Sequence, residues 1–238
     1  MSRITGLLFD FDGVILETEQ PGYWSWQKIY AEFGEELGME QFALVIGTHF
    51  IDFNPRAELE RRLGRALDWE ELERRREQYQ REIVARQPVQ PGVRELIQEA
   101  HAAGVKVAIV SSSPRYWIEH WLNHHQMQGE FDLIMNVDEV PVPKPAPDLY
   151  LAALKRLGLK AEDVVAVEDS PNGSKAAHRA GIFCVIVPSE ITALLKFEVD
   201  FPRLPSLRGV TLAQLEGMKR AYWRGGVCAV STAAAAKS

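Results

Sequence analysis

The stretch that most constrains the fold lies near the N-terminus, where an apolar run ends in two aspartates and a glycine. Residues 6–14 are Gly-Leu-Leu-Phe-Asp-Phe-Asp-Gly-Val. A short, continuous apolar run is typical of a strand that is buried on both faces of a parallel sheet. Because side chains alternate along a strand, we expect Asp10 and Asp12 to point the same way where the strand ends. Two acids this close repel each other unless a cation or a proton offsets the charge, although an ordinary acidic turn would give the same pattern.

The composition is that of an ordinary globular protein and excludes several classes. The 238 residues are 46% hydrophobic and 25% charged, which suits one large domain or a core with a smaller insert. The net charge of −6 argues against nucleic acid as a partner, but it allows an anionic small substrate beside a bound metal. Cys184 and Cys228 form no disulfide framework, so we expect a reduced, cytoplasmic location. No apolar run has the length of a signal peptide or a membrane span, so we expect no membrane partner.

The order of the elements predicts an α/β core that is interrupted by a helical insert. The segment Leu16–Pro21 is polar and contains a proline, so we expect a loop there. The rest of residues 17–86 shows only helical periodicity, clearest in the aromatic segment 23–36. On either side, apolar strands alternate with helices, which predicts a Rossmann-like, doubly wound parallel sheet. We therefore expect a discontinuous core of residues 1–16 and 87–225, an all-helical domain of residues 17–86, and a disordered tail of residues 226–238.

Chemically reactive side chains follow four of the predicted strands. Asp10 and Asp12 follow the first strand, Ser111 follows the strand 105–110, Lys144 comes after the strand 132–137, and Glu168 and Asp169 follow the strand 163–167. Ligands of open α/β sheets bind outside the carboxyl ends of the strands, so we expect these side chains to form one site. Carboxylates without cysteine or paired histidine suit Mg²⁺ rather than zinc. A lysine and a hydroxyl beside Mg²⁺ suit a phosphoryl group.

These motifs resemble those of the haloacid dehalogenase superfamily, and most closely its phosphatase and phosphomutase branch, which includes β-phosphoglucomutase. The matching segments are, in order, Asp-Phe-Asp-Gly at 10–13, Ser111, Lys-Pro-Ala-Pro-Asp at 144–148 and Glu-Asp-Ser-Pro-Asn-Gly at 168–173. The resemblance implies that the helical residues 17–86 are a C1-type cap, which closes over the site and excludes water.

The resemblance also implies catalytic roles for the matching residues. Asp10 would be the nucleophile that forms an aspartyl-phosphate. Asp12 would protonate the leaving oxygen as a general acid and then activate water as a general base. Ser111 and Ser112 would bind the phosphoryl oxygens, and Lys144 would neutralise the nucleophile and the phosphate.

A Mg²⁺ site is implied by the same resemblance. The carboxylates of Asp10 and Asp169 and the backbone carbonyl of Asp12 would bind the ion directly. Glu168 would act on it through water. Mg²⁺ is therefore the expected cofactor.

Two departures from β-phosphoglucomutase favour a phosphatase over a mutase. The linker histidine of that enzyme corresponds to Gly22 here, and its arginine-bearing cap loop is replaced by Gly-Thr-His-Phe-Ile-Asp at 47–52. A mutase must hold a second phosphate and shield its aspartyl-phosphate from water, and this cap shows neither device. His49 and Asp52 are the residues of this loop that we would expect to contact a substrate, and an ordinary loop role is equally open.

Two further patterns are interpreted as surface features. The basic run Arg74-Arg75-Arg76 is expected to be a solvated helix face paired with neighbouring glutamates. His120 and His124 have a spacing that can hold zinc, but the residue after His120 is not the glutamate of a metalloprotease motif.

We therefore predict a monomeric, Mg²⁺-dependent phosphatase of a small phosphorylated metabolite, such as a sugar phosphate. A phosphosugar mutase is the alternative within the enzymes. A non-catalytic binding or regulatory protein on the same fold is a third possibility, and the intact acids argue against it. The dehalogenase branch lacks both the second acid and the metal, so Asp12 argues against that branch.

Overall fold

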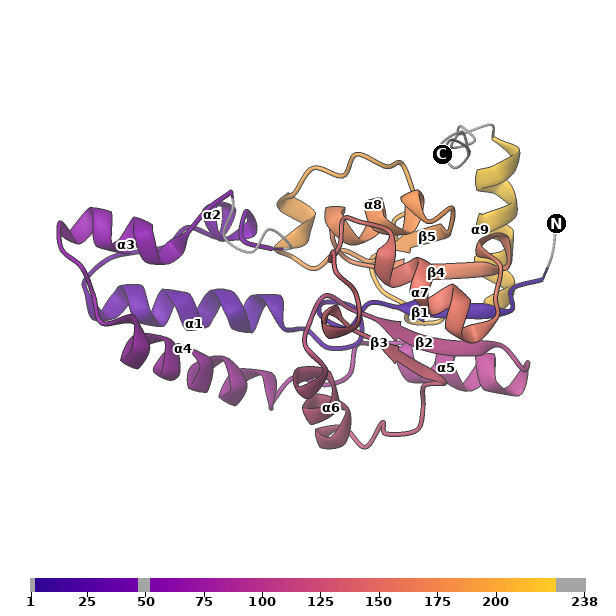
Figure 1. The fold of residues 1–238 in the computed structure, drawn as a ribbon, viewed down its shortest axis with the longest axis horizontal. Helices are drawn as coiled ribbons and strands as arrows, with labels where there is room; N and C mark the ends of the chain where they lie inside the picture. The colour runs from indigo at the N-terminus through magenta and orange to yellow at the C-terminus, as the bar shows by residue number, and fades with distance from the viewer. Residues whose placement is uncertain (1–2, 47–51, 226–238) are drawn as a thin grey trace.

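The sheet confirms the predicted parallel α/β architecture. The computed structural model describes residues 3–46 and 52–225, and within these residues the sheet has five parallel strands in the order β3-β2-β1-β4-β5 (Figure 1). The strands are β1 (Gly6–Phe9), β2 (Lys106–Val110), β3 (Leu133–Met135), β4 (Val164–Glu168) and β5 (Phe183–Ile186). Every residue of β1 is buried, as its continuous apolar sequence predicts. The first strand of the chain is thus the central one, with β2 and β4 as its neighbours.

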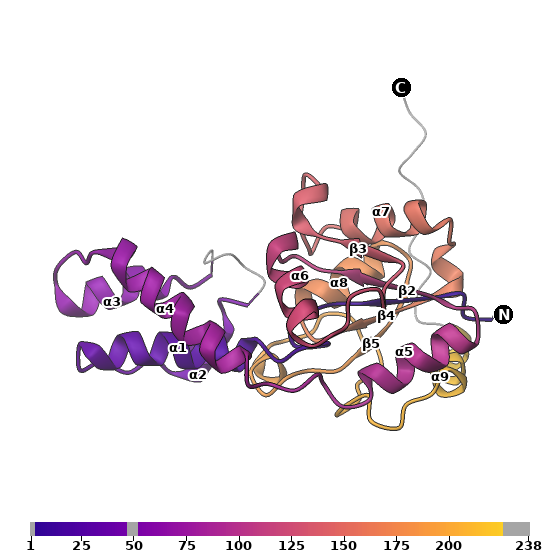
Figure 2. The same cartoon turned by 90° about the horizontal axis from the view of Figure 1, so that it is seen from below.

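Helices cover both faces of this sheet, as a doubly wound fold requires. Figure 2 shows α5 (Val93–Ala102) and α9 (Leu212–Arg224) on one face and α7 (Asp148–Leu157) and α8 (Pro171–Arg179) on the other. The remaining helix of this part is α6 (Arg115–His124), between β2 and β3. Short 3-10 turns lie at η1 (Val137–Glu139), η2 (Ala161–Asp163) and η3 (Thr192–Leu194).

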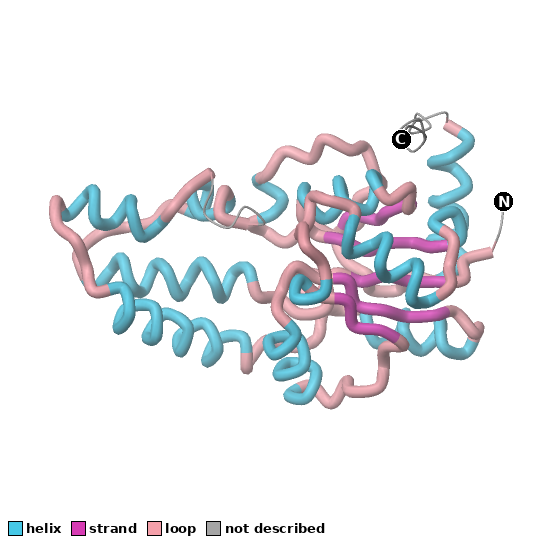
Figure 3. Tube along the Cα trace, in the orientation of Figure 1, coloured by secondary structure: helices cyan, strands magenta, loops and turns pink. Residues whose placement is uncertain are grey.

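In residues 17–46 and 52–86, four helices form a separate group beyond the carboxyl ends of the strands. They are α1 (Glu19–Glu32), α2 (Met39–Ala43), α3 (Pro55–Leu63) and α4 (Trp69–Val84), and we call them the helical insert. Figure 3 shows helices and loops in the insert and strands only in the other part. The aromatic residues Tyr23, Trp26 and Tyr30 are buried in a hydrophobic cluster of the insert, separate from the cluster around the sheet.

One expectation about the insert is wrong. The segment Leu16–Pro21 was expected to be a loop, but α1 already begins at Glu19. Pro21 lies in the first turn of this helix, where its missing N–H is not needed for an intrahelical hydrogen bond. The helix therefore begins only a few residues after Asp12.

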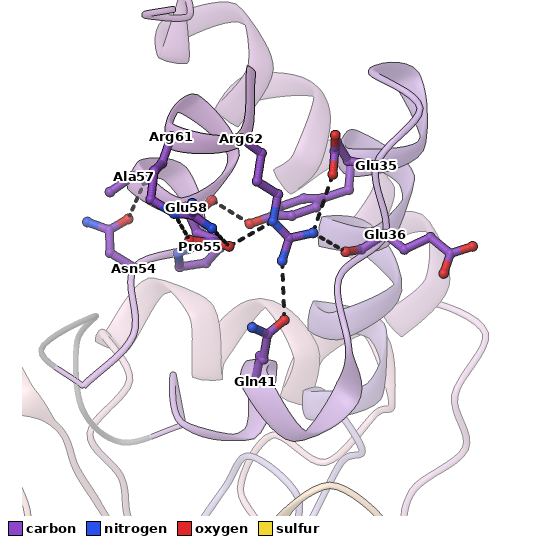
Figure 4. A network of polar contacts seen from close by, with 10 residues as sticks. Glu35, Glu36, Gln41, Asn54, Pro55, Ala57, Glu58, Arg61 and Arg62 are labelled. Atoms are coloured by element: carbon purple, nitrogen blue, oxygen red, sulfur yellow. Dashed lines mark hydrogen bonds and ion pairs between the residues drawn. The ribbon is translucent and has the colours of Figure 1, made fainter. Parts of the chain in front are cut away.

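A network of charged groups joins α3 to the connection between α1 and α2 (Figure 4). Glu58 accepts hydrogen bonds from Arg61 at 2.8 Å and from Arg62 at 2.7 Å, and these two bonds lower the pKa of its carboxyl to about 2. Arg62 also donates to the carbonyl of Glu36 at 2.7 Å. The insert is therefore stabilised by its own polar contacts as well as by its own apolar cluster.

Some expectations concern residues that the structure does not describe. His49 and the tail 226–238 lie outside the described residues. Among the described residues, none of the helices has the length and apolar character that crossing a membrane requires.

Candidate active site

The side chains that follow the strands meet at one edge of the sheet. Asp10 follows β1, Ser111 follows β2, and Asp169 follows β4. Together with Lys144 they line a cavity of about 410 Å³ between the sheet and the helical insert. The predicted convergence at the carboxyl edge of the sheet is therefore present in the structure.

Lys144 lies at the centre of this group. Its ammonium donates to Asp10 Oδ1, to Glu168 Oε1 and to the carbonyl oxygen of Val110, each at 2.7 Å. Burial opposes the charged form of this side chain, but attraction to Asp10 and Glu168 outweighs burial and raises the pKa of Lys144. Lys144 is thus a permanent positive charge held at a fixed place.

Asp10 is buried beside this cation and close to other acids. Burial is the largest cause that raises the pKa of Asp10, and repulsion from Glu168 and Asp12 adds to it, while Lys144 opposes the shift. The result is a pKa of about 7 for the Asp10 carboxyl. Burial also raises the pKa of Asp169, and repulsion from Asp10 adds to the shift. One lysine is therefore not enough to offset the acids gathered here.

The residues around the acids fit a divalent cation. Asp10, Glu168 and Asp169 can each offer one oxygen, and these three oxygens lie within 4.8 Å of one another. Glu168 Oε2 and Asp169 Oδ2 are buried without a hydrogen-bond partner among the described residues. Two glycines make room for them, because an added Cβ would lie 1.8 Å from Glu168 Oε2 at Gly173 and 2.3 Å from Asp169 Oδ2 at Gly13. Hard oxygen donors without sulfur or nitrogen suit Mg²⁺ or a similar ion.

Asp12 has a different environment from Asp10. Its Oδ1 accepts hydrogen bonds from Thr18 Oγ1 at 2.7 Å and from Trp117 Nε1 at 2.9 Å, and its Oδ2 accepts one from Ser113 Oγ at 2.5 Å. The sequence pattern did not indicate Thr18, Ser113 or Trp117 as site residues. The serine run beside Ser111 was the one available signal for Ser113, whereas nothing distinguishes Trp117 from a core tryptophan.

The serines after β2 take up different positions. Ser111 is buried, and its Oγ accepts a hydrogen bond from the backbone N–H of Ser113 at 3.0 Å. Ser111 and Ser112 both line the cavity. Their predicted role as ligands of a phosphoryl group stays a prediction.

The helical insert forms the opposite wall of the cavity. Glu19 at the start of α1 and Arg76, Gln80 and Arg81 on α4 line it. Burial raises the pKa of Glu19 well above its usual value, and repulsion from Asp12 adds to the shift. Glu19 was missed by sequence reasoning, because it was placed in a connecting loop.

The basic run on α4 is only partly the solvated face that was expected. Arg74 pairs with Glu71 at 2.6 Å, and its side chain is 67% exposed. The side chain of Arg76 is only 13% exposed. It pairs with Glu73 at 2.5 Å and donates to Gln80 at 2.8 Å, so the pairing with glutamates holds, but the side chain faces the cavity.

Known proteins resemble this chain over most of its length. A model of the haloacid dehalogenase-like hydrolases matches residues 7–187. The Bacillus subtilis (strain 168) protein named "Putative phosphatase YhcW" is 40% identical over 213 residues, which cover 89% of this chain and 96% of that protein. Hexitol phosphatase B of Escherichia coli (strain K12) is 27% identical over 233 residues, covering 90% of this chain and 98% of that protein.

A solved structure agrees with these sequence matches. A variant of CbbY from Rhodobacter sphaeroides, crystallised with xylulose-(1,5)bisphosphate, has a TM-score of 0.69 and 28% identity. The match covers 89% of this chain and 99% of that one. The family match spans the strand ends at which the acids, the serines and the lysine gather. The chain therefore belongs to the haloacid dehalogenase-like hydrolase family, as the resemblance of its four motifs predicted.

Proposed function

We propose that this chain is a Mg²⁺-dependent phosphatase that hydrolyses a small phosphomonoester through an aspartyl-phosphate. The observation that supports this most is the position of Lys144 between Asp10 and Glu168, beside two buried acid oxygens that have no hydrogen-bond partner within the described part of the chain. An anionic phosphate can approach an anionic nucleophile only where positive charge offsets the repulsion. Lys144 supplies one such charge, and the unpartnered oxygens fit a second.

Each acid has its own task in the proposed reaction. Asp10 attacks the phosphorus atom, and Lys144 orients its carboxylate and favours the ionised form without securing it alone. Asp12, held at the side of the cavity, gives a proton to the leaving oxygen and afterwards takes one from the attacking water. Asp10, Asp169 and the backbone carbonyl of Asp12 would hold Mg²⁺ directly, with Glu168 acting through water, and the bound ion would offset the charge of the phosphate and of these acids.

We propose the helical insert as the cap of this enzyme, with residues 17–86 as the cap and residues 1–16 and 87–225 as the core. The position of α4 along one wall of the cavity supports this assignment. The polar side chains of Arg76, Gln80 and Arg81 would face a hydroxylated or anionic substrate. A sugar phosphate or related metabolite fits that wall, and the names of the hexitol phosphatase and of the CbbY complex point the same way.

Hydrolysis of 4-nitrophenyl phosphate and of a panel of sugar phosphates tests the proposal. We expect turnover with Mg²⁺, loss of turnover with EDTA, and loss in Asp10→Asn. The matched control is Asp200→Asn, which changes an exposed aspartate in the same way and should leave turnover unchanged. Turnover that survives Asp10→Asn, or no turnover of any phosphomonoester with Mg²⁺, would contradict the proposal.

The same assay separates a phosphatase from a mutase. Gly22 stands where the mutase has its histidine, and a Cβ at Gly22 would lie 3.5 Å from both Gln80 Nε2 and the ring of Phe42. A Cβ would therefore fit there in ordinary van der Waals contact, but a glycine offers no side chain that could support the second phosphoryl transfer of a mutase. We therefore expect inorganic phosphate as the product from a hexose 1-phosphate, with or without added hexose bisphosphate. Bisphosphate-dependent formation of the 6-phosphate isomer would favour the mutase.

A further inference from the structure

The carboxylate of Asp12 is held by hydrogen-bond donors from three separate parts of the chain. Thr18 precedes α1, Ser113 follows β2, and Trp117 lies on α6. The bonds from Ser113 and Trp117 join residues that are 101 and 105 positions away from Asp12 in the sequence. The orientation of this carboxylate is therefore set by tertiary structure rather than by its own strand.

The three donors differ in what they can do when a proton moves. A serine or threonine hydroxyl can donate or accept, whereas an indole N–H can only donate. Asp12 Oδ1 always faces a donor from Trp117, because this N–H cannot reverse. Asp12 Oδ2 faces the hydroxyl of Ser113, which can donate to an ionised oxygen and accept from a protonated one.

We propose that Trp117 is a positioning residue that fixes Asp12 Oδ1 and leaves Oδ2 as the oxygen that exchanges protons with the substrate. This inference rests on the proposed phosphatase function. In the first step a bond forms between Asp10 and phosphorus, the bond from phosphorus to the leaving oxygen breaks, and the proton on Asp12 Oδ2 moves to the leaving oxygen. In the second step water oxygen attacks phosphorus, the bond to Asp10 breaks, and Oδ2 takes the proton from water.

The indole of Trp117 is well placed for this role. It lines the cavity and packs edge-on against Trp121, with ring centroids 5.5 Å apart and an interplanar angle of 81°. Trp121 is 1% exposed and belongs to the hydrophobic cluster of the sheet, so Trp117 packs against the buried core. A side chain packed in this way loses little further freedom when its N–H holds a partner, which is what orienting a proton donor requires.

Two substrates with different leaving groups test the proposal. Nitrophenolate leaves 4-nitrophenyl phosphate without needing a proton, whereas the alkoxide of benzyl phosphate needs one. In Trp117→Phe we expect kcat/KM for benzyl phosphate to fall about tenfold, a small part of what a general acid provides. The value for 4-nitrophenyl phosphate should stay within about twofold, because its departure does not depend on Asp12. Loss of packing or of binding would lower both values together, so the ratio of the two values is the informative measurement.

Further variants separate the hydrogen bond from the bulk of the ring. Trp117→His keeps a ring N–H at the position of the indole N–H. It should bring the ratio of the two kcat/KM values back towards that of the wild type. Trp117→Met is a second variant without a hydrogen-bond donor. If Trp117→Phe does not fold, the ratio of kcat/KM for benzyl phosphate to that for 4-nitrophenyl phosphate is measured in Trp117→Met instead. Trp223→Phe on α9, away from the cavity, is the matched control and should leave the ratio unchanged.

The outcomes distinguish this inference from the proposed function. An equal fall for both substrates, or no change of the ratio in either variant without a donor, would overturn the role of Trp117 while the phosphatase stands. A wild-type protein that hydrolyses neither substrate with Mg²⁺ would overturn the phosphatase, and the role of Trp117 with it.

Discussion

Lys144 and Asp10 show how single residues determine the electrostatics of the site. A buried lysine shared by two acids is costly to desolvate, and the arrangement is stable only because each group offsets the other. Even so, burial and the neighbouring acids raise the pKa of Asp10 to about 7. The nucleophile of the proposed reaction thus needs a cation before it is fully ionised at neutral pH.

The raised pKa of Asp10 makes cation binding depend on pH. The pKa of Asp10 is higher in the folded protein than in the unfolded chain, where it is about 4. The protonated Asp10 therefore makes its full contribution to the stability of the fold only below about pH 4. This contribution is lost as the pH rises towards 7, and a bound cation replaces the proton. We therefore expect the affinity for Mg²⁺ to rise between about pH 5 and pH 7 and then to level off. Calorimetric titration at several pH values measures it, and an affinity that stays flat over this range would contradict the prediction.

The site could be predicted from the sequence only where its chemistry follows the strands. Asp10, Lys144 and Asp169 were expected to meet, because parallel strands end at one edge of the sheet, and they do meet there. The contact between Trp117 and Asp12 could not be predicted in this way, because it depends on where a helix places one indole. The order of the strands determines where the backbone lies. A contact such as the one between Trp117 and Asp12 depends on side-chain packing, which the local sequence pattern does not predict.

At the scale of elements, α8 shows how a helix start shapes the site. The helix begins with Pro171, and Ser170 Oγ accepts a hydrogen bond from the backbone N–H of Gly173 at 3.1 Å. This capped turn brings the backbone of Gly173 so close to Glu168 that only glycine fits. The first turn of α8 therefore forms one wall of the acidic cluster.

Gly173→Ala tests this wall. The added Cβ would lie 1.8 Å from Glu168 Oε2, so Glu168 has to move away from the other acids. We expect the affinity for Mg²⁺ to fall by about tenfold or more, as displaced groups around metal ligands commonly cause, and turnover to fall with it. Gly217→Ala on α9 is the matched control, because no atom lies within 4 Å of its added Cβ. The control should gain up to about 1 kcal/mol of stability and keep its Mg²⁺ affinity. Equal Mg²⁺ affinity in Gly173→Ala and the wild type would contradict this description of α8.

The elements themselves were predictable where periodicity was long and apolar. The observed β2, β3 and β4 lie close to the predicted strands 105–110, 132–137 and 163–167, and the main error is the start of α1 at Glu19. Pro21 suggested a loop, but a proline in the first turn of a helix removes no intrahelical hydrogen bond. The error mattered, because it hid Glu19 as a residue that lines the cavity.

At the scale of the whole molecule, the segment around Ile191 joins the helical insert to the sheet-bearing part, and the sequence did not indicate this contact. Ile191, between β5 and η3, is fully buried and belongs to the cluster of the helical insert rather than to that of the sheet. Gln20 on α1 also donates a hydrogen bond to Glu190 beside it. The chain passes between the insert and the sheet-bearing part at two places, and this segment is therefore a further direct contact between them.

Ile191→Ala tests whether this segment fastens the insert to the rest of the molecule. Removing a fully buried isoleucine side chain costs on the order of 3 kcal/mol at a site that cannot collapse. Because Ile191 packs into the cluster of the insert, we expect the loss to appear as faster hydrogen exchange in α1 and α2, with the exchange of β1 and β4 unchanged. Ile97→Ala on α5 removes the same atoms from the sheet cluster and should instead speed exchange in the strands. If both variants gave the same pattern of exchange, the two clusters would unfold as one unit and Ile191 would have no special part in holding the insert.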